Sequence, residues 1–121
     1  MSYIDGFVIP VPSGKKQAYR EMVAKALPIF KEYGATRITE CWGTDVPDGK
    51  VTDFKTAVKA KPDESIVFSW IEWPSKTVRD AANERMKTDP RMKMTSDMPF
   101  DGQRMIFGGF EPLFDSGEGK R

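Results

Sequence analysis

The sequence predicts an α+β protein with a ferredoxin-like βαββαβ order. Four segments are rich in β-branched and aromatic residues, and two further segments carry apolar residues at helical spacing. Pro, Gly and Asp residues separate these segments, and the length of 121 residues suits one domain with a single core. The order therefore predicts a four-stranded antiparallel sheet that carries both helices on one face.

The first strand and the first helix are expected in the N-terminal third of the chain. Residues 3–11 are mostly β-branched or aromatic, and the run stops at Pro12. Ser13 is then expected to cap a helix whose apolar residues recur three or four positions apart until Gly34 ends it. Pro28 removes one backbone hydrogen bond inside this helix, which predicts a bend rather than two helices.

The central part of the chain adds two strands and the second long helix. Residues 36–46 are expected to form the second strand, and Asp53 is expected to cap a short helix after it. The strongest strand pattern covers residues 65–73. Pro74 and Ser75 then open the second long helix, which the Asp89-Pro90 pair closes.

The last strand is expected over residues 104–114, so that residues 1–114 form a single ferredoxin-like domain. Its two adjacent glycines, Gly108 and Gly109, predict either a β-bulge or a close approach of another group to the backbone. The polar residues 115–121 are expected to be a frayed tail.

Both faces of the predicted sheet carry apolar side chains. Alternate residues of the third strand point to opposite faces, and the two sets are Ile66, Phe68 and Trp70, and Val67, Ile71 and Trp73. Because one layer of helices covers only one face, we expect the other face to meet the same face of a second copy, which predicts a homodimer. Left bare, that face would promote aggregation.

Composition excludes several classes of function. The net charge of +1 and the absence of a long basic run disfavour a nucleic-acid partner. No apolar run reaches the roughly 20 residues of a membrane span, and the first residues lack the basic start of a signal peptide. The single cysteine rules out an internal disulfide framework. We therefore expect a cytoplasmic protein without a membrane partner.

The residue types that are missing narrow the chemistry further. The chain has no histidine, which removes the usual general base, zinc ligand and haem ligand. Neither GxxxxGK[ST] nor GxGxxG occurs, so the phosphate-binding loops of nucleotide sites have no support. We expect neither a metal nor a cofactor.

Four long motifs carry a resemblance to a known family. They are YIDGFVIPVP, FKEYGATRITECWGTDVPDGKVTDFKTAV, VFSWIEWP and MPFDGQRMIFGGFE, which together span nearly all of the chain except its last residues. In these motifs the chain resembles the bacterial YbaA-like family, domain of unknown function 1428. The resemblance implies a dimeric α/β barrel, in which two ferredoxin-like sheets face each other, and no established activity. That superfamily holds cofactor-independent monooxygenases, lactone isomerases, haem-degrading enzymes and stress-response proteins, so the fold alone selects none of them.

Four residues are the candidates for catalysis. Asp97, Asp101 and Arg104 bracket the entry to the last strand, where the arginine either holds an aspartate across the turn or clamps a substrate carboxylate. The first of these roles is the commoner. Cys41 lies in the second predicted strand, where a lone cysteine is more often a small buried hydrophobe than a nucleophile.

Five larger side chains are the candidates for substrate binding: Tyr3, Trp42, Trp70, Trp73 and Met105. Tryptophans stack on flat ligands, although in strands they more often fill a core or an interface. Trp70 and Trp73 cannot share a face of one strand, so a single cage of three tryptophans is not expected. Met105 belongs to a group of late methionines that either line an adaptable pocket or fill the core.

Two functional hypotheses from different classes follow. In the first, a pocket between the helices and the sheet binds or converts a small aromatic or lactone-like molecule, by cofactor-independent monooxygenase or isomerase chemistry. In the second, the chain is a non-enzymatic dimer that acts in an interaction or stress response. The first hypothesis requires a cavity between helices and sheet with converging polar groups, and the second requires a filled interior.

Overall fold

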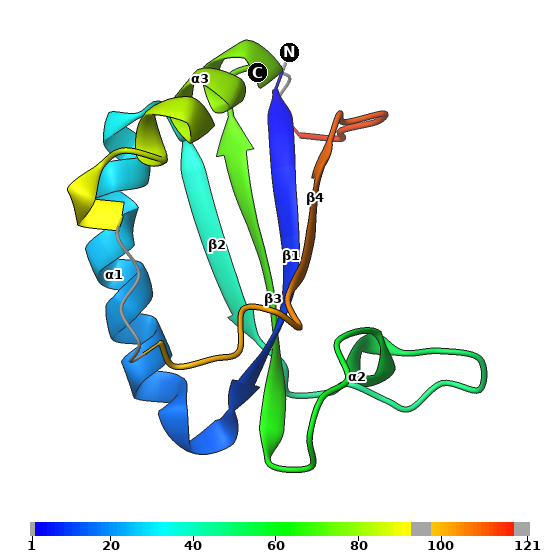
Figure 1. The fold of residues 1–121 in the computed structure, drawn as a ribbon. Coiled ribbons are helices and arrows are strands. Elements are labelled where there is room, and N and C mark those ends of the chain that lie inside the picture. The colour runs from blue at the N-terminus through cyan, green and yellow to red at the C-terminus, as the bar shows by residue number, and fades with distance from the viewer. Residues whose placement is uncertain (1, 93–97, 118–121) are drawn as a thin grey trace.

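The computed structural model describes residues 2–92 and 98–117 and confirms the ferredoxin-like α+β fold (Figure 1). Within these residues, four antiparallel strands form one sheet in the order β2-β3-β1-β4. The strands are β1 (Tyr3–Pro12), β2 (Arg37–Trp42), β3 (Glu64–Trp73) and β4 (Ile106–Phe110). The helices are α1 (Lys16–Glu32), α2 (Phe54–Ala57) and α3 (Lys76–Met86), with 3₁₀ turns η1 (Ser13–Lys15) and η2 (Pro90–Met92).

The two faces of the sheet have different cover. Helices α1 and α3 lie on one side of the sheet, here the helix face, and the opposite side is here the open face (Figure 1). Phe7 of β1 is opposite Ser69 of β3, and Ile71 of β3 is opposite Ile38 of β2. Residues paired across neighbouring strands point to the same face of a sheet. The odd-numbered residues of β1 and β3 therefore share one face with the even-numbered residues of β2, and this is the helix face.

The buried core lies on the helix face in two clusters. Tyr19 of α1 brings the first helix against β1 and β3, and Ala82 of α3 brings the other long helix against β3. The clusters consist of Ile9, Val11, Tyr19 and Val67, and of Ala35, Ile71, Trp73 and Ala82. Burying each of the larger apolar side chains stabilises the fold by about 1.5–3 kcal/mol, so these clusters hold the helices to the sheet.

Most of the predicted helix ends are confirmed. Gly34 follows α1 with a φ of 113°, and a Cβ atom at this position would lie 2.7 Å from Cγ1 of Val78. The side chains of Asp53 and Ser75 accept backbone N–H groups at the starts of α2 and α3. The Ser13 cap is wrong, because its hydroxyl instead lies 2.7 Å from that of Ser65 and α1 begins three residues later.

Two predicted strand bounds are also wrong. β2 ends at Trp42 rather than at residue 46, since Gly43 passes so close to β3 that a Cβ atom would lie 2.8 Å from the carbonyl oxygen of Ile66. The chain then turns away from the sheet. β4 covers only residues 106–110, because Arg104 is still in a turn, where its N–H donates to the carbonyl of Asp101.

The connection between β2 and β3, residues 43–63, folds onto one end of the open face, and we call it the excursion (Figure 1). Phe54 of α2 makes an edge contact with Phe68 of β3 at a ring separation of 6.1 Å. Ile66 of β3 and Val58 of the excursion are both buried, with only 4% and 1% of their surfaces exposed. The chain thus covers the Ile66 end of its own open face and leaves the rest uncovered.

The paired glycines of β4 mark a close approach, not a bulge. β4 pairs with β1 in unbroken register, with Gly108 opposite Gly6 and Gly109 opposite Asp5. A Cβ atom on Gly109 would overlap the hydroxyl of Tyr3 and lie 2.6 Å from Nη2 of Arg79. Glycine is therefore required at this position because the two side chains occupy the space beside the strand.

Replacing Gly109 by alanine is expected to lower the free energy of unfolding by about 1–3 kcal/mol, because the added methyl group must displace Tyr3 or Arg79. The matched control is Gly108→Ala, whose Cβ atom would meet only the Phe110 ring at 3.4 Å. We expect that variant to stay within about 0.5 kcal/mol of the parent protein. Urea denaturation of both variants measures the difference, and equal losses would contradict the assignment.

Candidate functional site

The residues predicted to be catalytic do not come together. Cys41 is exposed on the open face of β2, whereas Arg104 and Asp101 lie in the turn before β4 and bind each other. Asp97 lies outside the described residues. The structure therefore gives no cluster in which Cys41 and Arg104 act on one molecule.

Arg104 forms an ion-pair network that holds the turn to the sheet. Its Nη1 and Nη2 atoms donate to the two carboxylate oxygens of Glu64, each at 2.7 Å, and its Nε donates to Asp101 at 3.0 Å. Its Nη1 also donates to the carbonyl of Lys59 in the excursion, at 2.9 Å. The Glu64 side chain is only 4% exposed, so Arg104 neutralises a covered carboxylate that belongs to the structure.

Glu64 predicts a pH dependence of stability. Hydrogen bonds from Arg104 are the main cause that lowers the pKa of Glu64 from 4.5 to about 2 in the folded chain. A lowered folded-state pKa means that ionised Glu64 stabilises the fold above pH 4.5, and that this contribution is lost as the pH falls toward 2. In Arg104→Met we expect the stability difference from the parent protein to be largest above pH 4.5 and to shrink in acid.

Denaturation by urea at several pH values tests this prediction. The control is Lys87→Met, which also removes one cation, but from an ion pair with Glu84 whose side chains are 67% and 72% exposed. We expect it to differ little from the parent protein at any pH. A constant difference for Arg104→Met across the whole pH range would show that the arginine acts through packing alone.

The residues predicted to bind substrate are divided between the two faces. Trp73 is 1% exposed in the core, and Trp70 lies on the open face, as their alternation requires. Tyr3 lies under the guanidinium of Arg79, 5.1 Å from its ring centre. Trp42 packs at the edge of the first core cluster. Met105 is the one candidate of this group that lines the cavity between α1 and the sheet.

That cavity is the principal candidate site. It has a volume of about 540 Å³ and is bounded by α1, by the helix face of the sheet, by residues 98–100 and by Met105. Apolar and aromatic side chains form most of its wall, among them Phe7, Ile9, Met22, Val23, Leu27, Phe30, Ile38, Met92, Met98, Phe100 and Met105. The size and the apolar wall are those of a site for a small organic molecule.

Two polar side chains meet at the wall of this cavity. The hydroxyl of Tyr19 on α1 donates to Oε1 of Glu40 on β2 at 2.7 Å. Burial raises the pKa of Glu40, and this effect outweighs the hydrogen bonds from Tyr19 and Ser69 that lower it. Burial and the nearby Glu40 also raise the pKa of Tyr19, which keeps its hydroxyl protonated. Glu40 is nevertheless among the exposed residues of β2, and Glu21, Lys25 and Arg91 also line the cavity, so charged groups of both signs lie beside its apolar wall.

Glu40 is missing from the residues predicted from the sequence, although a signal for it exists. Ile38, Glu40 and Trp42 share the helix face of β2, so the glutamate interrupts an apolar alternation. Tyr19 lies within the apolar stripe of α1. The interruption could have identified a carboxyl group directed at the core, but its pairing with Tyr19 depends on how α1 docks on the sheet.

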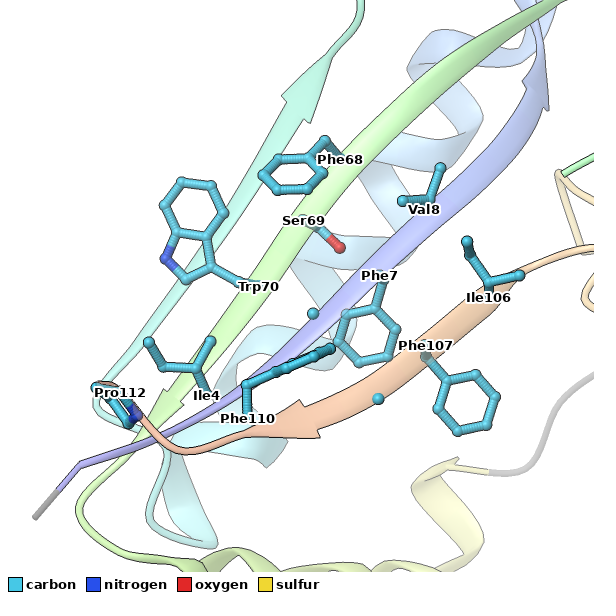
Figure 2. Close-up of a pocket in the computed structure, with 12 residues that line it drawn as sticks. Ile4, Phe7, Val8, Phe68, Ser69, Trp70, Ile106, Phe107, Phe110 and Pro112 are labelled. Carbon is cyan, nitrogen blue, oxygen red and sulfur yellow. The ribbon is translucent and has the colours of Figure 1, made fainter. Parts of the chain in front are cut away.

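A second hollow lies on the uncovered part of the open face. This trough has a volume of about 590 Å³, and its wall is apolar (Figure 2). Four of its large apolar side chains keep large exposed fractions, with Phe68 at 47%, Ile106 at 45%, Phe107 at 71% and Phe110 at 61%. Its residues offer surface for contact but no cluster of polar groups for chemistry.

The fold and the cavity define a class of protein, a small ferredoxin-like α+β domain with an apolar site between its first helix and its sheet. Residues 2–102 match the family described as Protein of unknown function (DUF1428), and the chain belongs to this family. It is 67% identical over 116 residues to "Uncharacterized protein YbaA" of Escherichia coli strain K12, covering 95% of this chain and 99% of the relative. The YbaA protein of Shigella flexneri gives the same values.

A solved structure from Mycobacterium tuberculosis, that of Rv0793, also matches, with a TM-score of 0.46 and 11% sequence identity. The match covers 97% of this chain and 100% of the other. Among the residues that the structure describes, none of the helices combines the length and apolar character of a membrane span.

Proposed function

We propose that this protein binds a small aromatic or lactone-like molecule in the cavity between α1 and the sheet, in the cytoplasm, as a homodimer. The observation that supports the proposal is the apolar cavity of about 540 Å³ with the carboxyl group of Glu40 at its wall. The alternative, a non-enzymatic interaction protein, requires a filled space between the helices and the sheet, and the described residues leave a cavity there. The cavity therefore favours a ligand-binding protein over the alternative.

The chemistry that suits this site is proton transfer of the isomerase type. A carboxyl group with a raised pKa takes up and returns protons more readily near neutral pH than an ordinary glutamate does. Such a step needs no metal and no nucleotide cofactor. Cys41, Asp101 and Arg104 take no part in it, because they lie away from the cavity.

A ligand screen with a matched pair of variants tests the binding function. A panel of small aromatic and lactone-like compounds is added to the full chain, and the melting temperature is recorded. Ala26 lines the cavity, whereas Ala24 is exposed on the same helix. We expect Ala26→Leu to abolish the shift that a bound compound causes, because the larger side chain fills the site, and Ala24→Leu to retain it.

Two results would contradict the proposal. One is a panel that produces no shift in melting temperature with the parent protein. The other is a shift that Ala26→Leu and the parent protein share, because the compound would then bind elsewhere.

The homodimer in the proposal rests on the trough. Its apolar residues, Phe68, Ile106 and Phe110 among them, form an exposed surface that would favour aggregation if it stayed bare in solution. Light scattering coupled to gel filtration should give twice the mass of the chain. We expect Ile106→Glu to reduce the mass to that of one chain, and Ala24→Glu, on the surface of α1, to leave it doubled.

A further inference from the structure

We infer that the two copies of the homodimer are crossed, so that the C-terminal arm of one copy, residues 111–117, contacts the excursion of the other. The inference rests on the proposed function, since the homodimer is taken from there, and it adds an interface outside the trough. The contact is reciprocal, because each copy contributes one arm and one excursion.

The arm and the excursion leave the sheet at opposite ends. The arm begins after Phe110, which is opposite Ile4 of β1, whereas the excursion covers Ile66, which is opposite Pro10 of β1. These two points on β1 are about 20 Å apart along the strand. Both segments project from the side of the open face (Figure 1), and Pro112 of the arm lines the trough (Figure 2). The trough therefore lies between them.

The most exposed large apolar side chains among the described residues gather in these two segments and in the trough. In the arm, Leu113 is fully exposed and Phe114 is 87% exposed. In the excursion, Val51 is 97% and Phe54 is 48% exposed. Single apolar residues on a surface are common, but here they continue an apolar trough at both of its ends. One partner that covers all three regions would remove this surface from water.

The surface area of the chain suits a contact of this extent. The chain exposes 8568 Å², whereas a compact monomer of 13.7 kDa exposes about 6600 Å². A standard interface takes about 800 Å² from each partner. The excess of about 2000 Å² is therefore large enough for the trough, the arm and the excursion to be covered together.

The excursion decides which ends of the two sheets meet. It rises above the open face at the Ile66 end, where Phe54 contacts Phe68. If the same ends met, the two excursions would collide and hold the troughs apart. A two-fold axis that runs across the strands instead places each excursion at the other end of the partner's trough, where the arm leaves the sheet. Val51 of one copy then lies beside Leu113 of the other.

Cysteine crosslinking of the full chain tests which ends meet. All variants carry Cys41→Ser, because the native cysteine is exposed on the open face. Val51→Cys and Leu113→Cys are made in separate chains, and each is treated with a short bismaleimide, alone and after the two chains have been unfolded and refolded together. We expect covalent dimers in the mixture and almost none with either variant alone.

Variants that remove apolar side chains measure the strength of the contact. Val51→Ser and Leu113→Ser should each weaken the dimer about tenfold, because each removes a large apolar side chain from two equivalent contacts. The double variant should lose less than the product of the two effects, since both substitutions remove the same contact. Ala81→Ser, on the exposed surface of α3, is the control and should leave the dissociation constant unchanged. Analytical ultracentrifugation measures all four.

The outcomes separate this inference from the proposed homodimer. If Val51→Cys alone gives covalent dimers, or if the mixture gives none although the parent protein is a dimer, the inference is overturned and the homodimer stands. The same holds if both serine variants change the dissociation constant by less than about twofold. If the parent protein has the mass of one chain, the proposed homodimer fails and the inference fails with it.

Discussion

Replacing Asp5 by alanine is expected to lower the free energy of unfolding by about 3–5 kcal/mol. Asp5 is 8% exposed near the start of β1, on the helix face. Its carboxylate accepts three hydrogen bonds from Arg79, the shortest at 2.8 Å, and one from Nε1 of Trp73 at 2.9 Å. Alanine would leave a buried indole N–H without its acceptor and a mostly covered guanidinium with only its bond to Asp80, and this loss is the source of the expected cost.

Urea denaturation of the Asp5→Ala variant measures the effect. The control is Asp80→Ala, because Asp80 binds the same Arg79 at 2.8 Å but its side chain is 47% exposed. We expect that variant to lose far less stability, because solvent screens an exposed ion pair. Similar losses of stability for the two variants would mean that burial does not set the relative strength of the ion pairs that Arg79 makes with Asp5 and Asp80.

Replacing Trp73 by alanine is also expected to cost about 3–5 kcal/mol, through the cavity that it leaves. Trp73 is 1% exposed and lies between β3 and the helices, with its ring centre 6.4 Å from that of Phe30. Its indole N–H is the donor to Asp5. The variant therefore loses both the packing of a large side chain and a buried hydrogen bond.

Trp70→Ala is the matched control for Trp73→Ala. Trp70 is three residues away on the same strand, but it lies at the trough and its Nε1 donates to Glu72 at 3.1 Å. We expect a clearly smaller loss of stability, measured by the same denaturation, and a weaker homodimer in light scattering. A larger loss for Trp70→Ala than for Trp73→Ala would reverse the assignment of the two faces.

Local patterns predicted the fold well because each of its elements has its own signal. The alternation around Trp70 and Trp73 identified both faces of β3, and Gly34 marked the end of α1. The strand ends were less predictable. The predicted second strand continued through residues 43–46, whereas in the structure β2 ends at Trp42, where Gly43 passes close to β3.

The candidate site was less predictable because it depends on contacts between distant residues. Glu64 and Arg104 are 40 positions apart, so the sequence offered Asp101 as the nearer partner. Glu40 and Tyr19 are 21 positions apart and meet only when α1 docks on β2. Asp5 and Glu40 nevertheless share a feature that is visible in the sequence: each is a carboxylate between apolar residues that face the core.

The excursion has a consequence for the proposed homodimer. It covers the Ile66 end of the open face, so a second sheet can contact only the trough and must stop beside α2. Each excursion must then lie beyond the edge of the partner's trough, which fixes the lateral offset between the two subunits. If the troughs of both copies form the contact of the proposed homodimer, a third copy would find them occupied, and the assembly would close at two.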